Sequence, residues 1–205
     1  MSQPETMWDR RYAQEAYVFG TAPNDFLARQ GHRLPAKGRA LAVADGEGRN
    51  GVWLAQQGLS VLSIDSSSVA QAKAGRLAQD HGVNITLELA DLSTWPWPVA
   101  EFDVVAGIFI QFAPPALRAM IFSGMVEALK PGGLLLLQGY RPEQLKYGTG
   151  GPSIEENLYT EDLLRDAFRD LEIIELRAHD SEIQEGLGHS GMSALIDLVA
   201  FKRSV

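Results

Sequence analysis

Short apolar runs alternate with amphipathic stretches along most of the chain. Apolar runs predict strands at residues 39–44, 59–64, 84–89, 102–109 and 133–140. Apolar positions at helical spacing predict helices between them at 49–57, 67–81 and 114–129. Gly58 and Gly82 follow the first two helices as expected for left-handed C-caps, and Pro114 suits the first turn of the third. This alternation predicts parallel βαβ units in an open, doubly wound α/β sheet.

The two ends of the chain depart from this alternation. Residues 5–30 are expected to form a helical segment in which aromatic and charged side chains are mixed. Near the C-terminus, Thr160 is placed to cap a helix that runs to about residue 168. Apolar runs at 171–178 and 192–202 then predict two strands with no helix between them, and such strands normally pair antiparallel. We expect one domain over residues 1–205, with an N-terminal helical segment at 1–35 and a core at 36–205.

Composition and charge narrow the class of protein. The 205 residues are 45% hydrophobic and 21% charged, which is ordinary for a globular domain with a full core. The absence of cysteine excludes disulfides, thiolate metal ligands and a cysteine nucleophile. A net charge of −8 disfavours a nucleic-acid partner. No apolar stretch approaches the roughly 20 residues that span a bilayer, and the first residues do not resemble a signal peptide. We therefore expect a cytoplasmic enzyme without nucleic-acid or membrane partners.

The strongest candidate chemistry lies in a glycine-rich turn between the first strand and the first helix of the alternation. Gly46, Gly48 and Gly51 permit a sharp turn and let a ligand approach the backbone at a helix N-terminus. Asp65 ends the next strand, about 20 residues beyond the first glycine, where a carboxylate meets a ribose diol. The pattern predicts an adenosine-type cofactor. The glycine spacing also fits a dinucleotide site, so a nicotinamide cofactor stays an alternative.

In such sheets the ligand lies beyond the carboxyl ends of the strands. These ends carry Asp65, then Asp91 and Leu92, then residues 109–111. Asp91 is placed to bind an adenine amino group and Leu92 to pack on the ring, although a turn role explains Asp91 equally well.

The whole motif series resembles class I S-adenosylmethionine-dependent methyltransferases. The resemblance rests on ALAVADGEGRNGVWLA at 40–55, SID at 63–65, ADL at 90–92, FDVV at 102–105 and LKPGG at 129–133. The GEGRN form of the turn is most similar to the tellurite-resistance and thiopurine-type enzymes, which act on small molecules. The resemblance implies a three-layer αβα, Rossmann-like fold with a seven-stranded sheet of order 3-2-1-4-5-7-6, whose seventh strand is antiparallel. It also implies that the N-terminal segment closes over the cofactor.

The resemblance and the strand ends together give a set of candidate residues for S-adenosylmethionine, whose product is S-adenosylhomocysteine. They are Trp8, Tyr12, Ala44, Asp45, Gly46, Gly48, Arg49, Asn50, Asp65, Ser66, Asp91, Leu92, Ile108 and Phe109. The chain departs from the usual acidic-x-Gly-x-Gly-x-Gly pattern, because Ala42 takes the acidic position and Ala44 that of the first glycine. Asp45 or Glu47 is a substitute for the missing carboxylate, and the sequence leaves both open.

Candidate residues for the acceptor follow the later strands. They are Gln111 after the fourth strand, Arg141 after the fifth, and Glu185 and His189 on the glycine-rich connection at 181–191. In tellurite-type relatives a histidine often stands where this chain has Gln111, which cannot act as a base. One histidine and two glutamates on the connection are too few to predict a metal site.

Methyl transfer from a sulfonium needs proximity and alignment more than catalytic side chains. A base is required only when the acceptor arrives protonated. The sequence therefore predicts a methyltransferase that acts on a small-molecule acceptor, with a nicotinamide-dependent oxidoreductase and a non-catalytic nucleotide-binding module as alternatives.

Overall fold

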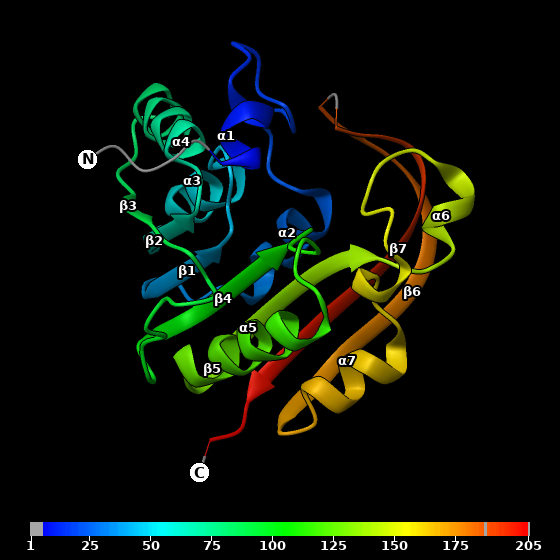
Figure 1. Cartoon of the computed structure of the whole chain (residues 1–205). Coiled ribbons are helices and arrows are strands. Elements are labelled where there is room, and N and C mark those ends of the chain that lie inside the picture. The colour runs from blue at the N-terminus through cyan, green and yellow to red at the C-terminus, as the bar shows by residue number, and fades with distance from the viewer. Residues whose placement is uncertain (1–5, 187, 205) are drawn as a thin grey trace.

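The computed structural model describes residues 6–186 and 188–204. Within these residues seven strands form one sheet in the order β3-β2-β1-β4-β5-β7-β6 (Figure 1). The strands are β1 (Arg39–Val43), β2 (Ser60–Asp65), β3 (Thr86–Leu89), β4 (Phe102–Ile108), β5 (Leu129–Tyr140), β6 (Leu171–Glu185) and β7 (His189–Lys202). Strands β1 to β5 pair in parallel, and β7 runs antiparallel to both β5 and β6. The strand order and the antiparallel seventh strand expected from the sequence are confirmed.

Most of the helices begin where a capping side chain or a proline favours a start. They are α1 (Met7–Tyr12), α2 (Asp25–Arg29), α3 (Arg49–Gln56), α4 (Ser68–Asp80), α5 (Pro115–Ala128), α6 (Gln144–Tyr147) and α7 (Glu161–Ala167), with 3-10 turns η1 (Gln30–Arg33) and η2 (Glu155–Asn157). Ser67 caps α4 and Thr160 caps α7, each accepting a backbone N–H of the first turn. Pro114 precedes α5. The predicted helices of the alternation are thus all present.

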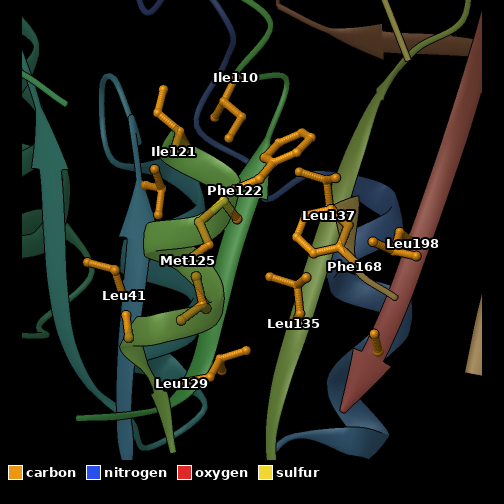
Figure 2. Close-up of a cluster of buried hydrophobic side chains, with 14 of the residues drawn as sticks. Leu41, Ile110, Ile121, Phe122, Met125, Leu129, Leu135, Leu137, Phe168 and Leu198 are labelled. Carbon is orange, nitrogen blue, oxygen red and sulfur yellow. The ribbon is translucent and has the colours of Figure 1, made fainter. Parts of the chain in front are cut away.

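The core has two halves, one on each face of the sheet. Alternate residues of β5 point to opposite faces, so Leu135 and Leu137 belong to one cluster and Leu134 and Leu136 to the other. The first cluster packs under α5 and α7 and includes Phe122, Met125 and Phe168 (Figure 2). The second packs against α2 and α3 through Phe26, Leu27 and Leu54. The three-layer αβα arrangement follows from these two buried faces.

Two expectations about the ends of the chain were wrong in extent. The segment expected to be helical at 5–30 contains two short helices joined by irregular backbone at 13–24, and residue 5, like residues 1–4 before it, lies outside the described part of the chain. The strands expected at 171–178 and 192–202 are longer, because β6 continues to Glu185 and β7 begins at His189. The connection predicted at 181–191 is therefore mostly strand, and its residue 187 also lies outside the described residues.

The tip of this hairpin packs on the N-terminal segment. Gly188 N–H donates to Val18 O at 3.0 Å. A Cβ on Gly186, whose φ is +68°, would lie 2.5 Å or less from the backbone of residues 18–20, so only glycine allows this approach. Two segments far apart in sequence are thereby joined beside the carboxyl ends of the central strands. Among the described residues, no helix is both long and apolar enough to cross a bilayer.

Candidate active site

A cavity of about 450 Å³ opens above the carboxyl ends of the central strands. This is the place where open α/β sheets bind ligands. Of the cofactor candidates expected from the sequence, all except Gly48 line the cavity, and of the acceptor candidates Gln111 and His189 do so. The N-terminal segment contributes Met7, Trp8, Arg11, Tyr12 and Phe19, and the loop after β5 contributes residues 151–154.

The glycine-rich loop turns sharply between β1 and α3. Three of its residues have positive φ: Ala44 at +47°, Gly46 at +58° and Gly48 at +87°. A Cβ on Gly46 would lie 2.8 Å from the Tyr12 hydroxyl, whereas one on Gly48 would lie 2.5 Å from the Ala74 Cβ. Gly46 therefore allows the N-terminal segment to close on the loop. Gly48 faces α4 instead, which is why it does not line the cavity.

Asp65 holds this loop from the end of β2. Its carboxylate accepts the Gly46 N–H at 2.9 Å and the Ser67 N–H at 2.8 Å. Burial raises the pKa of Asp65 against the opposing effect of these backbone hydrogen bonds. Each carboxylate oxygen retains a further lone pair. Asp65 thus combines a fixed position, a place in the cavity wall and spare acceptor capacity.

The two acidic residues considered as substitutes have different partners, since Asp45 supports the loop backbone and Glu47 binds the N-terminal segment. Asp45 accepts the Gly51 N–H at 3.1 Å and the Ser63 hydroxyl at 2.9 Å, and burial raises its pKa to about 7. Glu47 forms a buried ion pair with Lys73 at 2.5 Å and accepts the Val18 N–H at 2.7 Å. Each of them also lines the cavity.

Lys73 fixes the N-terminal segment over the site. Besides Glu47, its ammonium group donates to the carbonyl oxygens of Tyr12, Gln14 and Ala16 at 3.3, 2.9 and 2.7 Å. Lys73 was not among the site residues predicted from the sequence. Its signal was its position on α4, where it follows Ala70 and precedes Ala74 and Leu77 on the buried stripe of the helix.

The adenine-side candidates lie at the end of β3. Leu92 is buried, while Asp91 is exposed and accepts the Ser93 N–H at 2.9 Å and the Ser93 hydroxyl at 2.7 Å. These hydrogen bonds lower the pKa of Asp91. The side chain therefore forms the turn considered in the sequence analysis and also lines the cavity.

Gln111 and Arg141, two of the residues predicted to contact the acceptor, are engaged in hydrogen bonds and ion pairs with other parts of the protein. The Gln111 amide donates to Tyr140 O at 2.9 Å and to Asn157 O at 3.1 Å, and its oxygen accepts the Tyr140 N–H at 2.5 Å. Arg141 does not line the cavity, because its guanidinium donates to Leu195 O and pairs with Asp180 and Glu143.

Glu185 lies just behind the cavity and joins four parts of the chain. It pairs with Arg49 at 2.6 Å, accepts the Asn24 amide at 2.8 Å and lies 4.0 Å from His189 Nδ1. Burial opposes ionisation of Glu185, but Arg49 and the neighbouring histidine outweigh it and lower its pKa to about 2. Glu185 is therefore a carboxylate at neutral pH.

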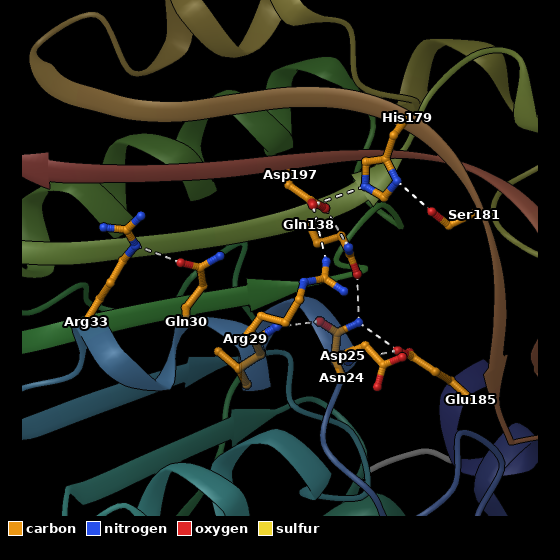
Figure 3. Close-up of polar contacts among 11 residues, drawn as sticks. Asn24, Asp25, Arg29, Gln30, Arg33, Gln138, His179, Ser181, Glu185 and Asp197 are labelled. Carbon is orange, nitrogen blue, oxygen red and sulfur yellow. Dashed lines mark hydrogen bonds and ion pairs between the residues drawn. The ribbon is translucent and has the colours of Figure 1, made fainter.

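A buried polar network continues from Glu185 to side chains of β5, β7 and β6 (Figure 3). Asn24 donates to Gln138 at 2.7 Å, and Gln138 donates to Asp197 at 2.6 Å. Asp197 also lies 3.1 Å from His179 Nε2. Asn24, Gln138 and Asp197 were not predicted from the sequence, where each was only a polar residue inside an otherwise apolar strand or at a helix start. These contacts fix the position of Glu185.

Residues 40–133 match a family model described as a methyltransferase domain. An uncharacterized methyltransferase from Synechocystis sp. is 32% identical over 114 residues, which cover 52% of this chain and 52% of the relative. The chain thus spans about half the length of this curated relative.

Two solved structures share the fold. TehB from Haemophilus influenzae has a TM-score of 0.72 and 17% identity, over 96% of this chain and 66% of TehB. The N-methyltransferase NodS from Bradyrhizobium japonicum, in complex with S-adenosylhomocysteine, has a TM-score of 0.66 and 15% identity, over 97% of this chain and 89% of NodS. At such identities the likeness establishes the fold. The methyltransferase domain predicted from the sequence is confirmed by the family match.

Proposed function

We propose that this chain, which carries a methyltransferase domain over residues 40–133, is an S-adenosylmethionine-dependent methyltransferase that acts on a small-molecule acceptor. The observation that carries the proposal is the placement of the glycine-rich loop and Asp65 on one cavity above the central strands. When bound, the cofactor supplies an activated methyl group on a sulfonium centre.

The residues that line the cavity fit this cofactor. Asp65 would bind the ribose diol, because it is a carboxylate with spare acceptor capacity beside the loop backbone. Leu92 and Ile108 would pack on the adenine ring, and Ser66 and Asp91 would hydrogen-bond near it. Trp8 and Tyr12 would face the methionine end, where aromatic rings favour a sulfonium cation as they favour ammonium groups. Arg49 and Asn50 would meet the cofactor at the start of α3.

We also propose that the chain works as one domain in which the N-terminal segment is a lid. The support is the set of contacts that hold the segment over the cavity, from Lys73 and Glu47 on one side and from the hairpin tip on the other. A closed lid would exclude water and align the acceptor with the methyl group. The cytoplasmic location and the lack of a nucleic-acid partner stay predictions.

An assay for released S-adenosylhomocysteine across a panel of small thiols, phenols, amines and carboxylates tests the proposed function. We expect turnover with a subset of the panel, and we expect Asp65→Ala to weaken cofactor binding sharply. Saturable S-adenosylhomocysteine binding without turnover across the panel would favour a non-catalytic binding module. Binding of NADH in place of S-adenosylhomocysteine would favour the oxidoreductase alternative.

A further inference from the structure

One wall of the cavity is an aromatic box around His189. The imidazole ring lies 4.5 Å from the Phe19 ring, 4.4 Å from the Phe109 ring and 5.6 Å from the Tyr140 ring, measured between centroids. Phe112 and Ile154 also line the cavity and are partly exposed to solvent, at 37% and 57%. Flat apolar walls of this kind favour a ring-bearing ligand, because aromatic pairs add stacking to the burial of apolar area.

His189 is the only side chain of this box that can take up a proton at neutral pH. Burial raises the pKa of Tyr140, so the phenol stays protonated. The Gln111 amide has no basic atom and is bonded to the backbone on both sides. Among the described residues that line the cavity, Asp45 supports the loop, Glu47 pairs with Lys73, and Asp65 and Asp91 lie at or just beyond the ends of β2 and β3.

Glu185 is the acidic residue next to the His189 imidazole. It lies 4.0 Å from His189 Nδ1, too far for a hydrogen bond but close enough to stabilise a positive imidazolium. His189 Nδ1 is buried and has no other partner. Glu185 is fixed in turn by Arg49 at 2.6 Å and by Asn24 at 2.8 Å. The nearby carboxylate favours the tautomer that carries its proton on Nδ1, which leaves Nε2 as the acceptor nitrogen of the neutral ring.

The charged and titratable groups around His189 act in opposite directions. Burial is the largest influence and lowers the pKa of His189, and the positive charges of Arg49 and Arg11 lower it further. The Glu185 carboxylate opposes them. Tyr140, on β5, is neutral. The imidazole is therefore an uncharged base at pH 7. When it takes up a proton, the Glu185 carboxylate is its nearby counter-ion.

Building on the proposed function, we propose that the acceptor is a small aromatic phenol or thiophenol and that His189 removes its proton during methyl transfer. The O–H or S–H bond breaks and its proton passes to His189 Nε2. The electron pair left on oxygen or sulfur forms the new bond to the methyl carbon. The methyl–sulfonium bond breaks with its electron pair remaining on the cofactor sulfur, which becomes neutral. His189 then returns the proton to solvent.

Ionisation of a coloured phenol tests this assignment without turnover. 4-Nitrophenol is titrated into the complex of the protein with S-adenosylhomocysteine below the pKa of the free phenol, and the visible absorbance of the phenolate is recorded. We expect phenolate to form in the wild-type complex, because a bound phenolate beside the ring stabilises the imidazolium and so raises the pKa of His189 in the complex. His189→Gln should abolish it. His81→Gln is the control, because His81 is an exposed residue at the end of α4 and contacts Gln56. Binding without ionisation in the wild type, or equal ionisation in His189→Gln, overturns the assignment.

Methylation rates give a second measurement. For a phenol that is protonated at the assay pH, we expect His189→Gln to lower kcat by about 100-fold or more. For a nitrothiophenol that is already ionised, the same variant should change kcat less than about threefold, because no proton is left to remove. Equal losses on both acceptors would show a structural role only, and no methylation of either by the wild type would overturn the acceptor class.

Calorimetry with S-adenosylhomocysteine separates this inference from the proposed function. If the wild-type protein and His189→Gln both bind S-adenosylhomocysteine with similar affinity but neither acceptor is ionised or methylated, the assignment of His189 fails alone. If the wild-type protein does not bind S-adenosylhomocysteine, the proposed function fails with it.

Discussion

Replacing Lys73 with methionine removes the ammonium group that holds the N-terminal segment. Methionine keeps the apolar stem of the side chain but loses the contacts to Glu47 and to three backbone carbonyls. Glu47 would then be a buried carboxylate without its counter-ion. Breaking one partner of a buried pair costs about 3–5 kcal/mol. In a chain of this length each 1 kcal/mol lowers Tm by about 2–4 °C, so we expect a loss of about 6–20 °C.

The change should also appear in cofactor binding and in proteolysis. If the N-terminal segment detaches before the core unfolds, Tm falls by less than this, but trypsin cuts the variant after Arg10 or Arg11 in α1 faster than it cuts the wild-type protein. The competent fraction of the protein then falls, and the apparent Kd for S-adenosylhomocysteine should rise by about tenfold or more. Differential scanning calorimetry, limited trypsinolysis and isothermal titration calorimetry measure these three effects.

Two variants control for non-specific damage. Glu47→Gln combined with Lys73→Met removes both charges and should recover part of the lost stability. Lys130→Met removes a half-exposed ion pair with Asp103 and should cost about 1 kcal/mol or less. The reasoning is refuted if Lys73→Met matches the wild-type protein in Tm, in trypsin sensitivity and in cofactor affinity.

Three further predictions follow from the glycine-rich loop. Asp65→Asn should weaken S-adenosylhomocysteine binding by about 1.5–3 kcal/mol, or roughly 10- to 100-fold by calorimetry, and an unchanged affinity would place the ribose elsewhere. Asp45 has a pKa of about 7, above its usual value, so the native protein retains a proton that the unfolded chain releases. The free energy of unfolding should therefore fall as pH rises from about 4 to 7. Over this range, urea unfolding should show the stability of Asp45→Asn rising relative to that of the wild type by up to about 1.4 kcal/mol per pH unit. A difference between the two proteins that does not change with pH contradicts this. Gly48→Ala should lower the free energy of unfolding several times more than Gly82→Ala, because both glycines have positive φ but only a Cβ at 48 meets Ala74. Gly82→Ala should lose about 1–2 kcal/mol. Equal losses in Tm would contradict the packing argument.

Much of the fold could be predicted from the sequence because local signals and long-range packing agree. β1, β4 and β5 contain unbroken apolar stretches at 40–43, 104–108 and 134–137 that are buried on both faces of the sheet, so the strand pattern there is unambiguous. The hairpin at the C-terminus was also predictable, since two apolar runs followed each other with no helix between them.

The length of that hairpin could not be predicted. Residues 179–185 are mainly polar and have no neighbouring strand on the outer side, because β6 is the edge of the sheet. Their strand conformation is set by pairing with β7 up to Glu185 opposite His189. The irregular path of residues 13–24 likewise depends on partners distant in sequence, namely Lys73, Glu47 and the hairpin tip.

The candidate site was predictable where function depends on backbone and spacing, as at the glycine-rich loop and Asp65. It was not predictable where a side chain finds its partner through the tertiary fold. Arg141 follows β5 as expected, yet Asp180 on β6 draws its guanidinium away from the cavity. Glu185 was a candidate for the acceptor, and its ion pair with Arg49 places it behind His189 instead.

Isothermal titration calorimetry of the wild-type protein with S-adenosylhomocysteine, and separately with NADH, tests the central claim most directly. The account predicts one molecule of S-adenosylhomocysteine bound per chain, with a Kd of about micromolar or tighter, and no heat with NADH. Saturable binding of NADH together with no binding of S-adenosylhomocysteine would contradict it.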